Sequence, residues 1–224
     1  MRLFGLSLVV LAAAGGLALA TVPATRVTSA SAAEQVLPNA EGANRSESAR
    51  IVLTAEDARL ASRAQLLPAN AKTLLSEGAM RHGNYAWNDK GVPAGKVTVW
   101  VDLRRQLVSV FRDGHEIGTA VILYGAPGLE TPRGTFPILR KVADYHSRSY
   151  DAPMPHSLFI TNDGVALHGS DVRYGRATHG CIGLPPEFAR LLFDEAKVGD
   201  KVTVVISDAG ATAKLAEAPS VKPD

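Results

Sequence analysis

Three side chains that could do chemistry fall within one stretch of the sequence, residues 165–184. This stretch holds the only cysteine of the chain, Cys181, and two of its six histidines, His168 and His179. A free thiol has a pKa of about 8.5, so a neighbouring imidazole that accepts its proton raises the reactive thiolate fraction. The stretch therefore predicts a cysteine nucleophile with a histidine base.

Glycines border these side chains and would let a substrate approach the backbone closely. Gly180 stands between His179 and Cys181, where it permits a tight turn. Successive N–H groups in such a turn can form an oxyanion site, in which one donor is typically worth about 2.7–4 kcal/mol in the transition state.

Two other interpretations of the same side chains remain open. They could supply three zinc ligands, with His156 or His146 as a fourth, because catalytic zinc uses three protein ligands and one open position. Their spacing matches no zinc signature, and only Asp171 offers a supporting carboxylate within the stretch. The thiol could also be a buried, inert side chain.

Composition excludes several other classes of protein. The 224 residues are 46% hydrophobic and 21% charged, which is ordinary for a globular protein. The formal charge of +2 gives no electrostatic reason to expect a nucleic-acid partner. A single cysteine excludes an intrachain disulfide and any four-thiolate zinc or iron–sulfur site.

The N-terminus predicts export. Arg2 is followed by an apolar run from Leu3 to Ala20, and residues 18–20 form a small-x-small cleavage site, as in a secretory signal peptide. The location would then be the periplasm or cell wall. An uncleaved inner-membrane anchor is the alternative, because the run approaches the ~20 residues of a membrane span. Exported proteins usually pair their thiols, so a lone cysteine is notable there.

The rest of the chain predicts a mostly β catalytic domain with a helical appendage. Residues 21–50 have the composition of a flexible linker, and residues 51–95 predict helices at 55–66 and 69–78. Alternating patterns and turn signals in 96–207 predict strands at 97–101, 107–112, 116–123, 135–141, 157–161, 165–167 and 201–206. One main helix follows the cysteine, at 187–196, and 208–224 is expected to be a disordered tail. This pattern favours a β-sandwich or barrel.

The motifs together resemble a known family. His168-Gly169, followed after a short loop by T-H-G-C at 178–181, resembles the signature of the YkuD-type L,D-transpeptidase catalytic domain of bacterial cell-wall enzymes. The resemblance extends to V-D-L-R-R-Q-L-V-S-V at 101–110, to T-P-R-G-T-F at 131–136 and to Met154-Pro155. It covers roughly residues 96–206.

The resemblance implies a β-rich fold and a cysteine acyltransferase that needs no metal or other cofactor. Cys181 would attack the third residue of a peptidoglycan tetrapeptide stem, release D-alanine and form a thioester, which an amine then resolves. His168 would be the general base, while His179 and Gly180 would shape the oxyanion site. The amine would come from another stem or from a protein, an outer-membrane protein being one candidate partner.

The resemblance also implies a set of substrate-pocket residues. Gly169 or Ser170 would orient the base through a backbone carbonyl. The other candidates are Thr178, Tyr145, Met154, Arg173 and Arg176. For Tyr145, Tyr150 and Met154, ordinary loop packing is an equally good interpretation.

Two departures from the family pattern bear on activity. Gly183 stands where the family usually has arginine or asparagine, so Arg173 or Arg176 would have to bind a substrate carboxylate instead. The loop between His168 and Thr178 is also short. A hydrolytic relative using water as acceptor, and a catalytically silent wall-binding module, are therefore the alternatives to a transpeptidase.

Overall fold

The structure is a computed structural model, which describes residues 43, 44, 49–208 and 210. All of them belong to one unit of the chain, Pro38–Asp224. The predicted signal peptide, most of the predicted linker and most of the predicted tail lie outside the described residues. Neither of the two helices described has the length and apolar composition needed to cross a bilayer.

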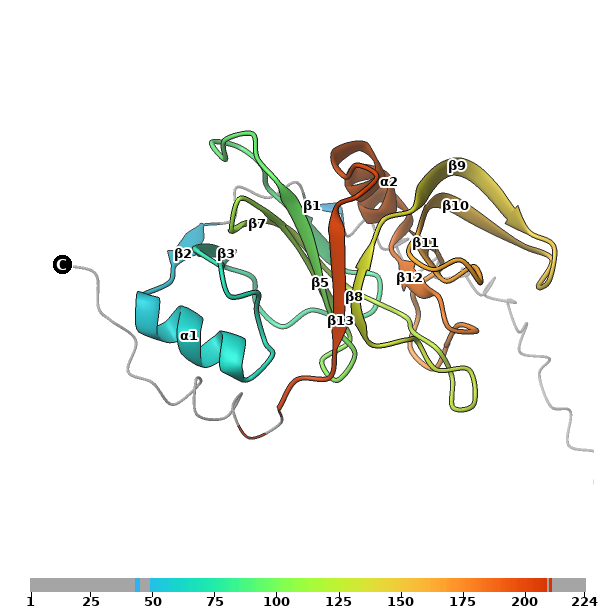
Figure 1. Cartoon of the computed structure of the whole chain (residues 1–224), viewed down its shortest axis with the longest axis horizontal. Coiled ribbons are helices and arrows are strands. Elements are labelled where there is room, and N and C mark those ends of the chain that lie inside the picture. Colours follow the sequence, from blue (N-terminus) through green and yellow to red (C-terminus); the bar gives the residue numbers. More distant parts are fainter. Residues whose placement is uncertain (1–42, 45–48, 209, 211–224) are drawn as a thin grey trace, which may run out of the picture. The chain divides into compact units, whose positions relative to one another are not determined.

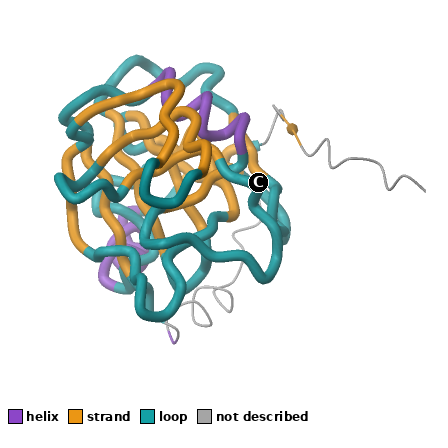
Figure 2. Tube along the Cα trace, turned by 90° about the vertical axis from the view of Figure 1, so that its right-hand side faces the viewer, coloured by secondary structure: helices purple, strands orange, loops and turns teal. Residues whose placement is uncertain are grey.

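Two sheets and two helices make up the described chain (Figure 1). The nine-stranded sheet contains β1 (Ala43–Asn44), β2 (Arg50–Val52), β3 (Thr73–Leu75), β4 (Tyr85–Trp87), β5 (Val97–Asp102), β6 (Leu107–Arg112), β7 (His115–Val121), β8 (Gly134–Pro137) and β13 (Lys201–Val205). The four-stranded sheet has the order β12 (Ile182–Leu184), β11 (Ala166–Gly169), β10 (Ala152–Phe159), β9 (Arg140–Ser147). The helices are α1 (Ala55–Arg63) and α2 (Pro186–Glu195). Strands and loops dominate, as Figure 2 shows, and the predicted mostly β fold is confirmed.

The centre of the large sheet follows directly from the alternating sequence. Val97, Val99 and Val101 of β5 are 3%, 0% and 0% exposed, because every second side chain of a strand points to the same face. β6 and β7 pair antiparallel through a turn at Asp113-Gly114, where both residues have positive φ, 48° and 85°. This is the hairpin geometry that Asp-Gly favours.

Helix α2 covers the core between the sheets. It begins at Pro186, where a missing N–H costs nothing, and it buries Phe188 and Leu192 completely. It packs against β10 and β11, the strands beside the candidate nucleophile. The predicted helix after the cysteine is therefore confirmed.

The predicted second helix at 69–78 is wrong. Thr73–Leu75 forms β3, which pairs with β2 and β7, and the Leu75 N–H donates to Glu116 Oε2 at 2.8 Å. Pairing with distant strands thus overrides the local helical pattern. Only α1 of the expected helical appendage is helical, with the Asp57 N–H capped by Thr54 Oγ1 at 3.1 Å.

The strands after residue 134 differ from the prediction. The single strand expected at 135–141 is divided into β8 and β9, which belong to different sheets. β10 begins at Ala152 instead of 157 and pairs with β9 as a long hairpin. The first half of β10 was not predicted because it contains Pro153 and Pro155, and proline usually argues against a strand interior.

Candidate active site

Strands β11 and β12 bring Cys181 and His168 to one face of the four-stranded sheet. The two strands are parallel, with Leu167 opposite Ile182 and His168 opposite Gly183. Cys181 directly precedes β12 and packs with Ala166, two residues before His168, whereas Leu167 and Ile182 point into the main core. Diagonal neighbours on adjacent strands are about 7–8 Å apart, within reach of a long side chain.

The His168 ring is held in the tautomer that a general base needs, with an unprotonated Nε2. It is buried, 8% exposed, and its Nδ1 lies 2.9 Å from the Gly169 carbonyl oxygen. A carbonyl only accepts, so Nδ1 carries the proton and Nε2 keeps its lone pair. Burial lowers the pKa of His168 below its ordinary value, while the Gly169 contact acts in the opposite direction. The ring is therefore neutral near pH 7.

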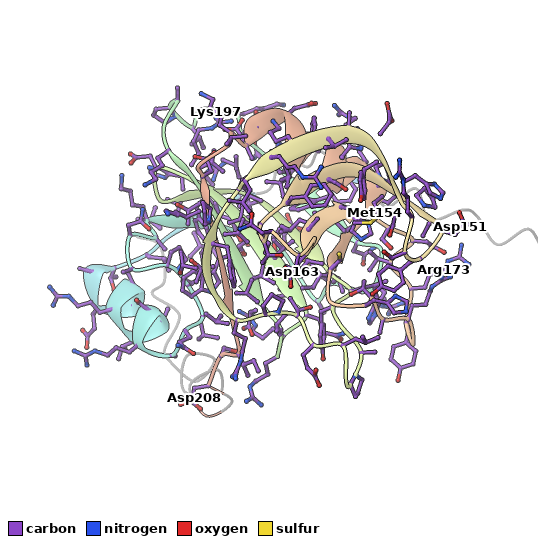
Figure 3. The ribbon with its side chains drawn as sticks, turned by 45° about the vertical axis from the view of Figure 1, so that its right-hand side comes forward. Asp151, Met154, Asp163, Arg173, Lys197 and Asp208 are labelled. Atoms are coloured by element: carbon purple, nitrogen blue, oxygen red, sulfur yellow. The ribbon has the colours of Figure 1, made fainter. Side chains whose placement is uncertain are left out.

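The Cys181 thiol lies half-buried in an apolar cluster. Its neighbours are Met154, Phe159 and Ala166, with Tyr145 at the edge. Burial raises the pKa of the thiol, the Ala166 backbone lowers it, and the charge of Asp163 raises it again. Met154 and Asp163 are both labelled in Figure 3, on the side of the molecule formed by the four-stranded sheet. The resting side chain of Cys181 is therefore a protonated thiol.

The turn that carries the thiol is fixed to a second loop. The Thr178 hydroxyl donates to the Cys181 carbonyl at 2.5 Å, and the Thr178 N–H donates to the Tyr124 carbonyl at 2.9 Å. Gly180 is buried and has a φ of +109°, a conformation that side chains disfavour. This geometry turns the chain sharply just before Cys181.

His179 lies on the opposite side of this turn from the core. It is exposed and stacks on Tyr150, with ring centroids 4.2 Å apart and planes 16° from parallel. Tyr150 belongs to the turn between β9 and β10, so the stack joins that hairpin to the cysteine loop. Tyr145, also on this hairpin, packs edge-on against Phe159 at 5.0 Å.

Arg173 and Arg176 lie on the exposed loop between β11 and β12. Arg173 Nε is 2.8 Å from Asp171 Oδ1, and an Arg176 nitrogen is 3.8 Å from Asp171 Oδ2. Their side chains are 74% and 63% exposed. Because both side chains are exposed, each guanidinium group can leave Asp171 and bind another carboxylate without a change in the fold.

The structure gives a packing reason for Gly183. A Cβ atom there would lie 3.0 Å from Ser170 Cβ, 3.2 Å from Ser170 Oγ and 3.3 Å from Leu123 Cβ. The backbone of Gly183 is also paired with Leu123 on its other side, through two hydrogen bonds of 2.9 Å. Ser170 and Leu123 therefore occupy the space of a larger side chain.

The histidines proposed as a fourth metal ligand are engaged elsewhere. His146 Nε2 lies 2.9 Å from Asp151 Oδ1, and the His156 ring packs edge-on against Phe193 of α2. Within the described ranges, no group of three or more His, Cys, Asp or Glu side chains could hold a metal ion.

Sequence reasoning missed two contributors to the site. Asp163 was read only as part of a turn, and Gly164 next to it accepts a long contact from Cys181 Sγ at 3.9 Å. The turn itself was the signal, since Asn162-Asp163-Gly164 leads directly into the strand that carries His168. Phe159 was missed as well, because its place in the predicted strand at 157–161 does not show that it packs in the same cluster as Cys181.

The comparisons with known proteins agree on one family. Residues 96–204 match the family model of the L,D-transpeptidase catalytic domain. L,D-transpeptidase 1 of Mycobacterium tuberculosis (strain ATCC 25618 / H37Rv) is 30% identical over 114 residues, which is 43% of this chain and 45% of the relative. This chain thus spans less than half of that relative.

Solved structures are similar over a comparable part of the chain. An L,D-transpeptidase from Stackebrandtia nassauensis is 28% identical, with a TM-score of 0.47, over 53% of this chain and 59% of that one. An L,D-transpeptidase from Mycobacterium smegmatis is 28% identical, with a TM-score of 0.46, over 49% of this chain and 58% of that one.

Proposed function

Because residues 96–204 match the family model of the L,D-transpeptidase catalytic domain, we propose that this protein is an exported cysteine L,D-transpeptidase of peptidoglycan. Cys181 is the nucleophile and His168 the general base. The observation that carries this proposal is the β11–β12 register, which places the two side chains on one face of the sheet. The hydrogen bond from His168 Nδ1 to Gly169 supports it, because it leaves Nε2 free of a proton.

The acylation step needs only these two side chains and the backbone. Sγ of Cys181 attacks the carbonyl carbon of the third residue of a tetrapeptide stem, while His168 Nε2 takes the thiol proton. The N–H groups of Gly180 and Cys181 stabilise the oxyanion of the tetrahedral intermediate. Its collapse breaks the peptide bond, and the imidazolium of His168 gives its proton to the amine of the departing D-alanine. A thioester remains on Cys181.

The second half of the reaction transfers the acyl group to an amine. The amine attacks the thioester carbonyl and loses a proton to His168 Nε2, and the thiolate leaves and is reprotonated by the same ring. The acceptor is a second stem or a protein amine, with an outer-membrane protein as one candidate. Substitution of water for the amine gives the hydrolytic alternative.

The reacting pair starts uncharged in this proposal. Burial lowers the pKa of His168 and raises that of Cys181, so both shifts favour thiol and neutral imidazole over an ion pair. Proton transfer then accompanies attack instead of preceding it. The charge of Asp163 disfavours the thiolate further.

Arg173 and Arg176 are proposed to bind a carboxylate of the stem. A planar guanidinium binds carboxylates bidentately, and both groups are exposed and already paired with a carboxylate, Asp171. The replacement of both arginines by alanine should raise KM for the tetrapeptide. Arg190→Ala, an exposed arginine paired with carboxylates on α2, is the matched control and should leave KM unchanged. An unchanged KM in the double variant would rule this role out.

One experiment tests the activity itself. The protein without residues 1–20 and its Cys181→Ala and His168→Gln variants are incubated with disaccharide-tetrapeptides, and the products are read by mass spectrometry. A cross-linked dimer that requires both side chains supports transpeptidation, whereas tripeptide alone means that the protein is a hydrolase. His115→Gln, a histidine of the other sheet, should behave as wild type.

Products that form equally in the Cys181→Ala variant would refute thiol catalysis, and no products with any of the proteins would favour a silent wall-binding module. A covalent mass increase with a carbapenem, absent in Cys181→Ala, is the companion assay for a competent thiol. Export is tested separately by fractionating cells that express the chain with and without residues 1–20. Retention of the full-length chain in the cytoplasm would contradict the proposed location.

A further inference from the structure

A row of four residues crosses the four-stranded sheet at the end that carries Cys181. Phe159 of β10 is opposite Arg140 of β9 on one side and Ala166 of β11 on the other. The parallel register of β11 and β12 places Ala166 beside Cys181, which packs in the same apolar cluster as Phe159. Because residues directly opposite one another in paired strands point to the same face, Arg140 and Cys181 share one face of this sheet.

The Arg140 guanidinium lies between its own strand and the thiol. Its Cζ is 3.5 Å from the centre of the Phe159 ring and 5.5 Å from the centre of the Tyr145 ring. A group stacked on Phe159 is two strand spacings from Cys181, which is about 10 Å at the usual spacing of about 4.8 Å. The cation–π contact therefore holds this guanidinium near the proposed nucleophile, although the side chain is exposed.

The hydrogen-bond donors of Arg140 are not used by the protein. Within the described part of the chain, its side chain makes no hydrogen bond and no ion pair. A guanidinium carries five N–H donors, and stacking on a ring consumes none of them. Lys141, the next residue, differs, because its ammonium donates to the Phe193 and Ala196 carbonyls at the end of α2. Arg140 thus combines a defined position with available donors.

An anionic ligand at this end of the sheet needs a cation. Asp163 lies in the turn between β10 and β11, and its charge raises the pKa of Cys181, so it would also repel a substrate carboxylate. Arg173 and Arg176 belong to the loop that leaves the other end of β11, and Figure 3 shows Arg173 well apart from Asp163. Arg140 is at the end where the repulsion has to be offset.

Two further charged groups near the cysteine loop are engaged elsewhere. The Glu130 carboxylate, on the loop that lies against Gly180, accepts from the Gly128 N–H at 2.8 Å. Arg133 lines a hollow with Trp100 and residues of β13, over the nine-stranded sheet. Neither group stands in the row that joins Arg140 to the thiol.

We propose that Arg140 binds the C-terminal carboxylate of the tetrapeptide stem, which belongs to the departing D-alanine, and so selects stems that end in a free carboxylate. The reach fits this role. An attacked carbonyl carbon lies about 3–3.5 Å from the nucleophile, one residue spans up to about 3.6 Å, and a charge-assisted hydrogen bond adds about 2.8 Å. These lengths together cover the roughly 10 Å between Cys181 and the guanidinium. The inference rests on the proposed transpeptidase function and adds the group that recognises the leaving residue.

Two substrates that differ only in the terminal charge test the inference. The disaccharide-tetrapeptide and its C-terminal amide contain the same scissile bond, and the release of D-alanine or D-alaninamide is followed by mass spectrometry. Wild type should use the carboxylate form at least tenfold more efficiently in kcat/KM, because a hydrogen-bonded charge pair is lost with the amide. The difference should lie in KM, since the terminal carboxylate is bound equally before and during attack.

Arg140→Gln should use both substrates with equal efficiency, at the level that wild type shows with the amide. Arg140→Lys keeps the charge and should keep part of the preference. Arg59→Gln, an exposed arginine of α1, is the matched control and should retain the full preference. The double variant of Arg173 and Arg176 should lose efficiency with both substrates alike. Turnover of the amide shows in each case that the variant is folded.

The outcomes separate this inference from the function on which it rests. No release from either substrate by wild type would overturn the proposed function, and this inference with it. Equal use of the two substrates by wild type would overturn this inference alone. A preference that survives Arg140→Gln, or one that disappears in the double variant of Arg173 and Arg176, would also overturn it.

Discussion

Replacement of Gly183 by alanine tests whether the β11–β12 packing explains this departure from the family pattern. The new Cβ would meet Ser170 Cβ at 3.0 Å and Leu123 Cβ at 3.3 Å, whereas carbon atoms attract best at about 3.5–4.0 Å. Both neighbours are attached directly to paired backbone, so they cannot rotate away. Overpacking of this kind typically costs about 1–3 kcal/mol.

A smaller effect opposes this cost. Alanine loses less conformational entropy than glycine on folding, which is worth about 0.4–1 kcal/mol where the backbone conformation suits both. Gly183 lies in β12 and is not among the positive-φ glycines, so this gain applies. The net expectation is that Gly183→Ala lowers the free energy of unfolding by about 1–2 kcal/mol.

Urea denaturation of the single and double variants measures both effects. Ser170→Gly removes two of the three close contacts, so Gly183→Ala with Ser170→Gly should recover most of the loss. A coupling free energy of about 1 kcal/mol between the two sites is expected from a double-mutant cycle. Gly169→Ala is less suitable as a control, because its own Cβ would meet Pro155 at 3.0 Å. Gly128 has open space around it, so Gly128→Ala measures only the cost of placing alanine at a positive φ.

The reasoning is refuted if Gly183→Ala is as stable as wild type, or if Ser170→Gly does not relieve it. In either case Gly183 would not be a packing requirement. The decay of a once-active site would then be the better explanation of this residue. Carbapenem acylation of the same variants shows whether the packing also fixes the position of Cys181.

Three further variants test individual contacts. Asp163→Asn removes a charge that raises the pKa of Cys181, so the pH profile of iodoacetamide alkylation should move to lower pH, and an unchanged profile would contradict this effect. Thr178→Val removes the hydroxyl that holds the Cys181 carbonyl and should slow carbapenem acylation about fivefold, the equivalent of about 1 kcal/mol, with Thr135→Val as control. Glu116→Gln should abolish a stability loss that wild type shows as pH rises from about 4.5 to 7. The folded state binds the extra proton in that window, so its stability falls by up to about 3 kcal/mol before levelling, as measured by urea denaturation at each pH.

The parts of the fold with a local cause were predictable. Alternation in 97–101 and the Asp113-Gly114 turn specify β5–β7, since both signals lie within a few residues of each other. The strand before His168 and the helix after Cys181 were likewise predictable from a turn and from two prolines. These elements carry Cys181 and His168, which is why the candidate site could be proposed from the sequence.

The features of the fold that depend on contacts between distant residues could not be predicted from the sequence. β3 is a strand because β2 and β7 pair with it, and β10 is a strand despite Pro153 and Pro155 because β9 lies beside it. The close fit of Gly183 with Ser170 arises only once β11 and β12 are in register. The Tyr150–His179 stack similarly joins two loops that are distant in sequence.

The uncharged state of the proposed catalytic pair bears on the proposed export of the protein. Thiolates are oxidised far more readily than thiols, and the compartments outside the cytoplasm are oxidising. Burial and the charge of Asp163 raise the pKa of Cys181, so they keep the lone thiol protonated until a substrate is bound. His168, with its lowered pKa and available Nε2, can still take the proton when attack begins. The burial that lowers the reactivity of the resting thiol therefore also protects it from oxidation. Asp163→Asn should make Cys181 both more reactive toward iodoacetamide and more rapidly oxidised by hydrogen peroxide.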